Sequence, residues 1–560
     1  MVEKIVNLLN KEFGGLHGPA ILLAGSAFLS QLLALLRDRL LASGFGAGSH
    51  LDVYYAAFKI PDFLFVIIGS FLSITVIIPI LVNRVKNDDN NKEAKRFLSG
   101  LLSFFFLFFV ASASFLFFLI PWASFFLAPG FDELQRAEFI QLTRVMLLSP
   151  FFFGVSGLIG SVSQVFKRFI VYALGPVLYN IGVIFGIIFL FPKLGLIGLA
   201  YGVVLGAFMH MLVQLPVVLR TGLVPLLVLK MRFDDIRFVV SRSSPRTVAL
   251  GSSQLSLMVI VAIASLMRDG SISVFNFAFN LQSVPLAVVG ISYSVAALPN
   301  LSDIFASKKM GEFMEYVETA FRHILFWSIP AMVLFVVLRA QIVRVILGAG
   351  QFDWVGTRLT AAALAIFALS VASQSITNLL SMGYYSAGLT KRPVLARLTG
   401  SFIVVILAVL FVLPFGFNAQ LLSFLETIFR ISGLPGTNIV LLVFAFSFGN
   451  IITSFIIIYN FKRDFGSMSL GLGKTIFQIV VASLFMGGVA YMVLNLFVLF
   501  FAVNTFWSIF FQGLSAGLIG LVFSFLLLYW FKNRALFELI EALHKKFWKN
   551  KVISSPEKDL

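Results

Sequence analysis

The chain has 560 residues, of which 59% are hydrophobic and only 12% are charged. This composition excludes an ordinary soluble globular protein and is typical of a protein embedded in a lipid bilayer. The net charge of +17 would suggest nucleic-acid binding in a soluble chain, but its distribution along this chain indicates membrane topology instead, so no nucleic-acid partner is expected.

Hydropathy predicts fourteen transmembrane helices, because fourteen apolar stretches are each long enough to cross about 30 Å of hydrocarbon. The fold class is therefore all-α and integral to the membrane. Ahead of the first span, residues 2–13 place apolar side chains on one side, which predicts a short interfacial helix and not a cleavable signal peptide. The predicted spans lie near 19–43, 52–82, 97–121, 137–166, 169–192, 194–220, 246–267, 272–304, 323–346, 357–385, 393–415, 437–461, 473–499 and 505–531.

Basic residues fall almost entirely in alternate loops, as the positive-inside rule requires. Both termini are therefore predicted to be cytoplasmic, and the basic loops are expected to contact anionic lipids. The opposite loops hold few cations: Arg136, Lys193, Arg268, Arg358 and Arg430. The predicted inner cations are Arg84, Lys86, Lys92, Lys95, Arg96, Lys167, Arg168, Lys230, Arg232, Arg237, Lys308, Lys309, Lys391, Arg392, Lys462, Arg463, Lys545, Lys546, Lys549 and Lys551.

Landmarks in the first half recur in the second at offsets between 221 and 226 residues. Because each unit holds an even number of spans, both units have the same orientation and form parallel repeats. The matched pairs are Gly25-Ser26 with Gly251-Ser252, Pro61 with Pro285, Phe131-Asp132 with Phe352-Asp353, and Lys167-Arg168 with Lys391-Arg392.

The repeat predicts two six-helix lobes, 1–222 and 246–461, joined by a basic cytoplasmic linker at 223–245. Residues 462–560 then contain a C-terminal pair of spans and a basic cytoplasmic tail. An insertion at 416–436 is predicted to be a short amphipathic helix on the outer face, either a lid over the cavity mouth or a passive interfacial loop.

Charged residues inside the first two spans are the main functional signal. Arg37 and Asp38 lie in the first span, and Asp52, Lys59 and Asp62 recur at helical spacing in the second. A charge inside a bilayer costs several kcal/mol, so it normally faces an internal cavity. Two interpretations remain open: ion pairs that hold two helices together, or the charged wall of a central cavity.

Span eight faces this charge with polar but neutral residues, among them Asn276 and Asn280, while Arg144 of span four adds to the charge of the first lobe. One cationic wall opposite a neutral wall suits an anionic substrate such as a phosphorylated lipid. Pro61 and Pro285 are expected to kink spans two and eight and leave room for the cavity.

The segment 30–61, SQLLALLRDRLLASGFGAGSHLDVYYAAFKIP, resembles the MurJ/MviN family of lipid II flippases. The resemblance implies the fold of the multidrug/oligosaccharidyl-lipid/polysaccharide exporter superfamily. It also implies alternating access that moves lipid-linked peptidoglycan precursor from the inner to the outer leaflet of the bacterial cytoplasmic membrane. The matching motifs are Arg37-Asp38, Phe45-Gly46-Ala47-Gly48, Asp52, Ala57-Phe58-Lys59, Pro61, Lys167-Arg168-Phe169, Gly175-Pro176-Val177-Leu178, Asn180-Ile181, Pro285 and Ala297-Leu298-Pro299.

On this basis Arg37 and Lys59 are expected to hold the diphosphate, because arginine offers a bidentate fork and lysine a point charge. The other expected substrate-binding residues are Asp52, Asn280 and Arg144, and an ion pair between Arg37 and Asp52 is an alternative role for both. Structural or gating roles are expected for Asp38, Asp62, Pro61 and Pro285. The chain departs from the family pattern of arginines at Gln31, Phe65 and Asn280, and from a glutamate at Ser70, which leaves an altered substrate open.

The sequence also bears on enzymatic, metal-binding and scaffold functions. The chain has no Walker A sequence and short, acid-poor outer loops, so it is not expected to be an enzyme. The chain has no cysteine and its five histidines are scattered, so no metal or cofactor is expected, although coupling to an ion or to the membrane potential stays open. A flippase for another polyprenyl-diphosphate-linked glycan and a non-transporting scaffold are the alternatives. The expected partners are the lipid-linked glycan, anionic lipids and cell-wall synthesis proteins, with the chain itself a monomer.

Overall fold

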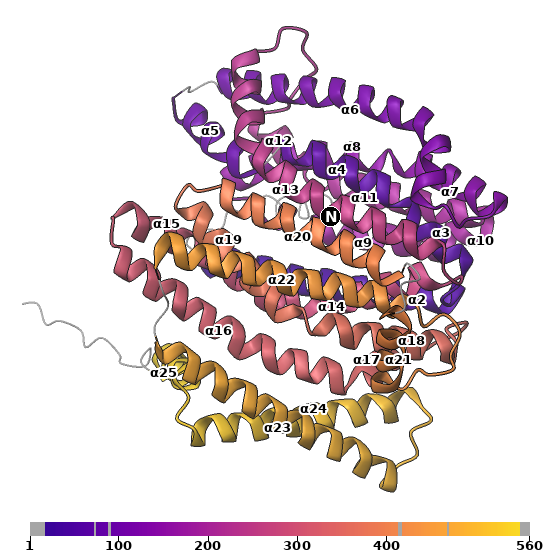
Figure 1. The fold of residues 1–560 in the computed structure, drawn as a ribbon. Coiled ribbons are helices and arrows are strands. Elements are labelled where there is room, and N and C mark those ends of the chain that lie inside the picture. The colour runs from indigo at the N-terminus through magenta and orange to yellow at the C-terminus, as the bar shows by residue number, and fades with distance from the viewer. Residues whose placement is uncertain (1–16, 72–73, 88–90, 413–416, 467–469, 549–560) are drawn as a thin grey trace, which may run out of the picture. The chain divides into compact units, whose positions relative to one another are not determined.

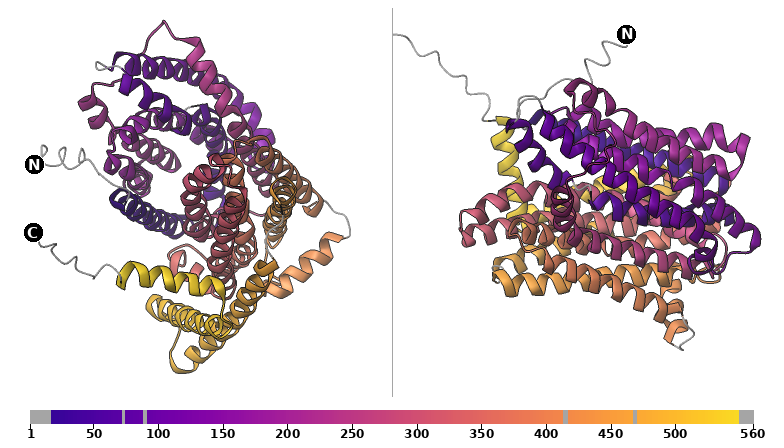
Figure 2. Two further views of the ribbon diagram at one scale, coloured as in Figure 1. Left: turned by 90° about the vertical axis from the view of Figure 1, so that its left-hand side faces the viewer. Right: turned by 90° about the horizontal axis from the view of Figure 1, so that it is seen from above.

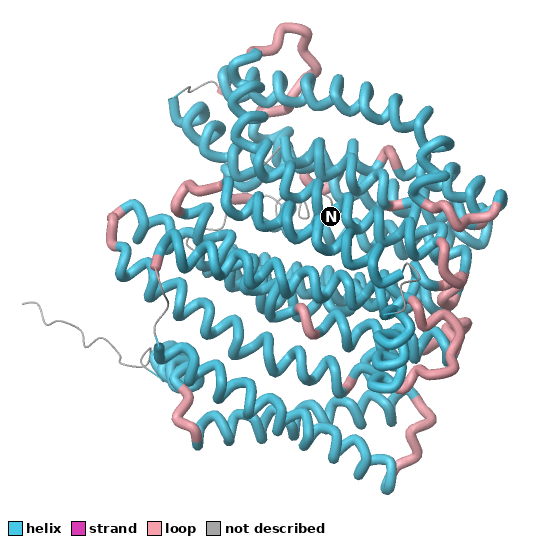
Figure 3. The backbone as a smooth tube through the Cα atoms, in the orientation of Figure 1, coloured by secondary structure: helices cyan, strands magenta, loops and turns pink. Residues whose placement is uncertain are grey.

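The computed structural model describes residues 17–71, 74–87, 91–412, 417–466 and 470–548. Within these ranges the regular structure is entirely helical, with short connecting loops and no strand (Figure 3). The expected all-α class is therefore confirmed. The predicted interfacial helix at 2–13 and part of the C-terminal tail lie outside the described residues.

The first half of the chain forms a series of helices and one π-helical turn, η1 (Figure 1). They are α2 (His17–Phe45), α3 (Ser49–Ala57), α4 (Lys59–Phe71), α5 (Ile74–Asn87), α6 (Lys92–Leu127), α7 (Glu133–Met146), α8 (Ser149–Val165), α9 (Phe169–Phe185), η1 (Gly186–Leu190), α10 (Phe191–Leu194), α11 (Leu196–Leu212) and α12 (Leu215–Thr221).

The second half continues in the same way and contains a second π-helical turn, η2. Its elements are α13 (Phe233–Ser265), α14 (Ser271–Pro285), η2 (Leu286–Ile291), α15 (Ser292–Ala306), α16 (Met310–Val337), α17 (Arg339–Ile346), α18 (Trp354–Ala368), α19 (Val371–Ser386), α20 (Lys391–Val412), α21 (Phe417–Phe429), α22 (Ile439–Phe465), α23 (Leu470–Phe500), α24 (Phe506–Trp530) and α25 (Arg534–Trp548).

Eleven helices among the described residues are long and apolar enough to cross a membrane, or twelve if the bent pair α18 and α19 is one span. They coincide with the last twelve predicted spans, from 97–121 to 505–531. The first two predicted spans correspond to α2 and to the short helices α3, α4 and α5, which are not among the twelve. The chain is thus a multi-pass membrane protein, and the count of fourteen stays a prediction.

Both prolines singled out in the sequence lie where regular α-helix is interrupted. Pro61 has no N–H to donate to the carbonyl of Ala57, and α3 ends at that residue, with a turn at Phe58 before α4. Pro285 ends α14, and the π-helical turn η2 follows directly. Whether these interruptions serve gating stays a prediction.

The chain divides into two compact units. The first unit comprises Met1–Leu281, Ile346–Ala363 and Pro393–Gly449; the second comprises Gln282–Val345, Leu364–Arg392 and Asn450–Leu560. These boundaries differ from those of the predicted lobes, which were defined by an internal repeat. The repeat therefore stays a prediction.

In the first unit, glycines allow α9 with η1 to approach α11 closely. A Cβ atom added to Gly182 would lie 2.3 Å from the Cα atom of Gly206, and one added to Gly186 would lie 2.5 Å from that of Gly202. Only glycine permits such backbone contact between membrane helices. Helix α9 also packs against α2, so this contact fixes the position of one wall of the cavity described below.

In the second unit, α23 and α24 pack side by side as a hairpin, and α25 follows at its end (Figures 1 and 2). Contacts to the half-buried carboxylate of Glu538 attach α25 to α16. The Nη2 atom of Arg322, a residue only 2% exposed, donates to Oε1 of Glu538 at 2.8 Å. Nε2 of His323 lies 3.2 Å from Oε2 of the same carboxylate. The helix that follows the last span is therefore anchored through charge.

Candidate functional site

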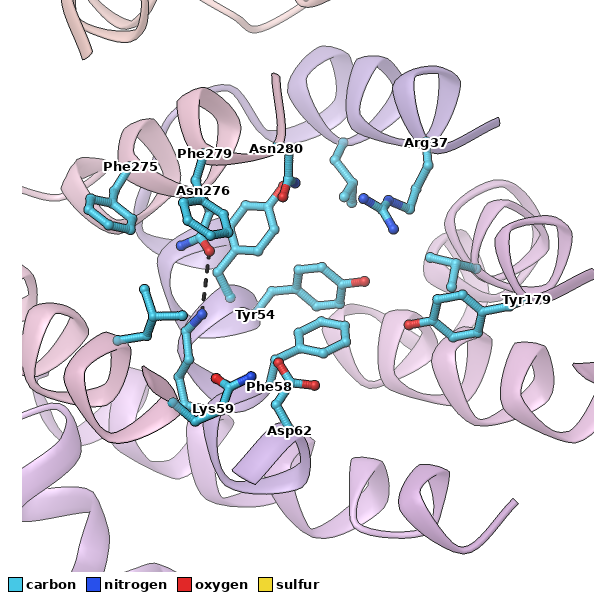
Figure 4. A pocket seen from close by; sticks show the side chains of 15 residues that line it. Arg37, Tyr54, Phe58, Lys59, Asp62, Tyr179, Phe275, Asn276, Phe279 and Asn280 are labelled. Atoms are coloured by element: carbon cyan, nitrogen blue, oxygen red, sulfur yellow. Dashed lines mark hydrogen bonds between the residues drawn. The ribbon is translucent and has the colours of Figure 1, made fainter. Parts of the chain in front are cut away.

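The first unit contains a polar cavity of about 280 Å³, enclosed by α2, α3, α4, α9, α13 and α14 (Figure 4). Helices α9, α13 and α14 belong to candidate membrane spans, so the cavity lies within the apolar part of the protein. Its lining residues are Arg37, Leu41, Tyr54, Tyr55, Phe58, Lys59, Asp62, Tyr179, Val183, Gln254, Leu257, Phe275, Asn276, Phe279 and Asn280.

Arg37 on α2 is oriented by its neighbour. Its Nε and Nη2 atoms donate to Oδ1 of Asp38 at 2.9 and 2.7 Å, and Nη1 reaches Oδ1 of Asn180 at 3.4 Å. The other oxygen of the buried Asp38 accepts a hydrogen bond of 3.0 Å from Nδ2 of Asn280. The alternative ion pair between Arg37 and Asp52 is thus not formed: Arg37 pairs with Asp38, and its Nη1 atom contacts Asn180.

Asp52 caps the N-terminus of α14 and does not line the cavity, contrary to the prediction. Its oxygens accept hydrogen bonds from the backbone N–H groups of Gly270 and Ser273, both at 2.7 Å, and from the Ser273 hydroxyl at 2.5 Å. A carboxylate is stabilised at a helix N-terminus by unpaired N–H groups and the helix dipole. Sequence spacing could not show that Asp52 lies beside the free N–H groups at the start of α14, which bind its carboxylate.

Lys59, the first residue of α4, enters the cavity from the side opposite Arg37 (Figure 4). Its Nζ atom lies 3.5 Å from Oδ1 of Asn276, a long hydrogen bond. Asn276 is itself oriented by a 2.8 Å bond from its Nδ2 to the carbonyl of Ile272. Asp62 follows Lys59 by three residues and also lines the cavity. The cavity therefore presents two cationic side chains from different helices.

Arg144 does not reach this cavity, contrary to the prediction. It lies in the last turn of α7, where its Nε donates to the carbonyl of Phe117 at 3.3 Å and its guanidinium stacks 4.4 Å from the centre of the Phe117 ring. Neither Gln31 nor Phe65 lines the cavity, and the Phe65 side chain contacts Phe153 instead. The positions expected to carry family arginines are thus spread over several surfaces, and only Asn280 faces this site.

Some lining residues were not predicted. Tyr54, Tyr179 and Gln254 place polar groups on the cavity, and Phe58, Phe275 and Phe279 add aromatic surface. The hydroxyl of Tyr55, a residue only 7% exposed, has no hydrogen-bond partner among the described residues. A polar atom within an apolar span was the available signal for Tyr179 and Gln254. The described residues contain no cluster of His, Asp and Glu that would hold a metal ion.

Comparison with known proteins identifies the family. The model of the family "Lipid II flippase MurJ" matches residues 41–512, most of the chain. The chain belongs to the lipid II flippase MurJ family. The matched region contains Lys59, Asp62, Asn276 and Asn280, whereas Arg37 lies four residues ahead of its start. The family membership expected from the segment 30–61 is thereby confirmed.

Individual MurJ proteins resemble the chain over much of its length. Lipid II flippase MurJ of Burkholderia cenocepacia is 26% identical over 386 residues, which cover 66% of this chain and 73% of that protein. The probable lipid II flippase MurJ of Buchnera aphidicola subsp. Acyrthosiphon pisum is 26% identical over 384 residues, covering 68% and 75%.

Solved structures share the fold of the chain. A lipid II flippase MurJ in an inward closed conformation matches with a TM-score of 0.73 at 23% identity, covering 91% of this chain and 99% of that one. An inward-facing multidrug resistance transporter of the MATE family, from the MOP superfamily, matches with a TM-score of 0.62 at 13% identity, covering 80% and 96%. The expected exporter-superfamily fold is confirmed.

Proposed function

We propose that this chain is a lipid II flippase, which moves lipid-linked peptidoglycan precursor from the inner to the outer leaflet of the bacterial cytoplasmic membrane by alternating access. Membership of the MurJ family is the observation that carries the proposal. In the proposed orientation both termini are cytoplasmic, and the basic inner loops contact anionic lipid headgroups.

The substrate's diphosphate is held by Arg37 and Lys59. Each of these cations already has a long contact that a phosphate oxygen can replace: 3.4 Å from Arg37 Nη1 to Asn180, and 3.5 Å from Lys59 Nζ to Asn276. Charge-assisted hydrogen bonds to phosphate are shorter and stronger than such contacts. Asp38 keeps the arginine oriented before the substrate arrives, which lowers the entropy lost on binding.

Transport requires binding and release, not chemistry, so no catalytic residue is assigned and the chain acts as a transporter and not as an enzyme. Besides Asp62, the cavity offers neutral polar groups, among them those of Tyr54, Asn276 and Asn280, which can donate or accept hydrogen bonds. An ion gradient or the membrane potential supplies the driving force, since moving a charge across the membrane is coupled to the potential.

A flippase for another polyprenyl-diphosphate-linked glycan is the second candidate. The observation that favours it is Asn280, which is neutral and donates to Asp38, so α14 adds no cation to the cavity. Both candidates hold the same diphosphate and differ only in the glycan. A non-transporting scaffold that acts with cell-wall synthesis proteins would need no substrate at this site.

The deciding experiment uses a strain depleted of its own lipid II flippase. Cells that rely on this chain should survive and expose lipid II on the outer leaflet, measured by its accessibility to an externally added lipid II-cleaving toxin. The matched control is Arg37→Ala at equal membrane abundance, which should expose none. Expression in the membrane without outward lipid II would reject the proposal. Outward movement of a different polyprenyl-linked glycan by the same protein would establish the second candidate instead.

A further inference from the structure

A second cavity of about 450 Å³ lies in the first unit and shares no lining residue with the polar one. It is enclosed by the C-terminal ends of α13 and α20, the start of α22, and the inserted helix α21. Its lining is apolar, with Ile263, Leu266, Phe411 and Leu422 among the contributors, except for the side chains of Asn418 and Asn438.

Helix α21 is attached to its surroundings through its C-terminal half. The Thr437 hydroxyl donates to Oε1 of Glu426 at 2.6 Å, and the side chain of Arg358 on α18 donates to the carbonyl of Arg430. The cavity lies beneath the opposite half, which carries Asn418, Ala419 and Leu422. The N-terminal half of α21 therefore covers the cavity, and polar contacts at the C-terminal end of the helix fix its position.

Asn418 supplies the polar feature of this hollow. Its Nδ2 atom is buried and has no hydrogen-bond partner among the described residues. A buried amide donor without an acceptor is costly, so a ligand that brings an oxygen acceptor is favoured. Apart from Asn438, the remaining wall offers only hydrocarbon contact. A ligand that fits both requirements has a long apolar chain and an oxygen at its polar end, which is the chemistry of a membrane lipid.

The surroundings of the cavity supply such a ligand. Phe424 and Ile428, on the other side of α21, are 61% and 51% exposed, as expected for a helix in contact with lipid. In the proposed orientation the ends of α13 and α20 lie at the outer leaflet, where the tails and ester oxygens of lipids meet.

We propose that this cavity binds one hydrocarbon chain of an outer-leaflet lipid, with Asn418 donating to an oxygen at the polar end of that lipid. This chain is that of a bulk phospholipid, and a polyprenyl lipid is the alternative that the test distinguishes. The site is separate from the cationic cavity, and its occupancy does not require that the chain transports lipid II.

The test uses the purified full chain in nanodiscs that contain phosphatidylglycerol with a diazirine at the end of one acyl chain. After illumination, labelled peptides are identified by mass spectrometry. Label is expected on α21 and on residues 263–267, and Leu422→Trp, which fills the cavity, should remove it. Phe424→Trp is the matched control, because it adds the same ring to the outer side of the same helix, and it should retain the label.

Ala419→Leu is the second filling variant, at an exposed lining position that tolerates a larger side chain, and it should lower the label as well. Asn418→Leu removes the donor at similar volume and should lower labelling by the phospholipid probe. A parallel set of discs with a diazirine-bearing polyprenyl phosphate distinguishes the two lipid sources. Label from the phospholipid probe that the filling variants remove supports the proposal, whereas label from the polyprenyl probe alone would overturn it in favour of a polyprenyl lipid. Labelling of α21 that is equal in wild type, Leu422→Trp and Ala419→Leu would overturn it.

Discussion

Asn280 on α14 donates a 3.0 Å hydrogen bond to Asp38 on α2, the same carboxylate that holds the guanidinium of Arg37. Two helices far apart in the sequence thus orient one arginine, and the neutral amide does so without adding charge. This arrangement leaves Arg37 and Lys59 as the cations of the cavity lining. Variants at these and other charged positions should distinguish groups that bind the substrate from groups that stabilise the fold.

Arg37→Ala should abolish transport, because the diphosphate loses a charge-assisted hydrogen bond worth about 1.5–3 kcal/mol. Arg37→Lys should restore part of the activity, since the charge returns without the bidentate geometry. Lipid II accessibility on the outer leaflet is the measurement. Arg144→Ala is the control, because Arg144 lies outside the cavity on α7. Equal losses in both alanine variants would show that the cavity is not the binding site.

Lys59→Met keeps most of the apolar stem of the side chain and removes its charge, so it should lower transport while leaving membrane abundance unchanged. The expected cause is the loss of one cation from the diphosphate site. Asn276→Ala should have a smaller effect, because its 3.5 Å contact with Lys59 is weak and the cation remains. A larger loss in Asn276→Ala than in Lys59→Met would contradict this order.

Asp52→Asn should destabilise the protein, because a buried carboxylate that accepts three hydrogen bonds at the start of α14 becomes a neutral amide. The expected cost is about 1–3 kcal/mol. It is measured as the loss of folded protein with temperature in size-exclusion chromatography. Transport per folded molecule should stay near that of the wild type. Wild-type thermal stability combined with lost transport would assign Asp52 to the substrate after all.

Glu538→Ala should destabilise the second unit strongly, since it leaves the buried Arg322 without its main partner. Removing one member of a fully buried ion pair costs about 3–5 kcal/mol, and the cost here should be smaller because Glu538 is 30% exposed and Glu318 stays 3.9 Å from Arg322. Glu312→Ala is the matched control: its pair with Lys309 is more than half exposed on both sides, and such pairs contribute about 0–1 kcal/mol. Similar thermal stability of the two variants would refute the anchoring of α25 by charge.

Hydropathy predicted most of the fold correctly because long apolar stretches have few alternatives to a membrane helix. Twelve predicted spans coincide with observed helices or a bent pair. The first two predicted spans are not among these twelve. The first coincides with α2, and the segment 52–82 contains α3, α4 and α5, with α3 ending shortly before Pro61, which removes a backbone donor.

The site was predicted in part. Arg37, Lys59 and Asn280 do meet at one cavity, since charged and amide side chains in apolar helices tend to face the interior. Asp52 was misplaced because its carboxylate is bound by N–H groups at the start of α14, a helix more than 200 residues away in the sequence. Arg144 was misplaced because one charge near a helix end does not specify which neighbour it faces. Such choices depend on contacts between helices that are distant in the sequence.

The cap formed by Asp52 has a mechanical consequence for the first unit. It joins α3 to α14 through three bonds of 2.5–2.7 Å, whereas Lys59, after the break at Phe58, contacts the same helix through a single bond of 3.5 Å. The contact with α14 is therefore firm near Asp52 and weak near Lys59. We expect the cavity to widen when α3 and α4 rotate relative to α14 about the Asp52 contact. Substrate would then enter and leave beside Lys59.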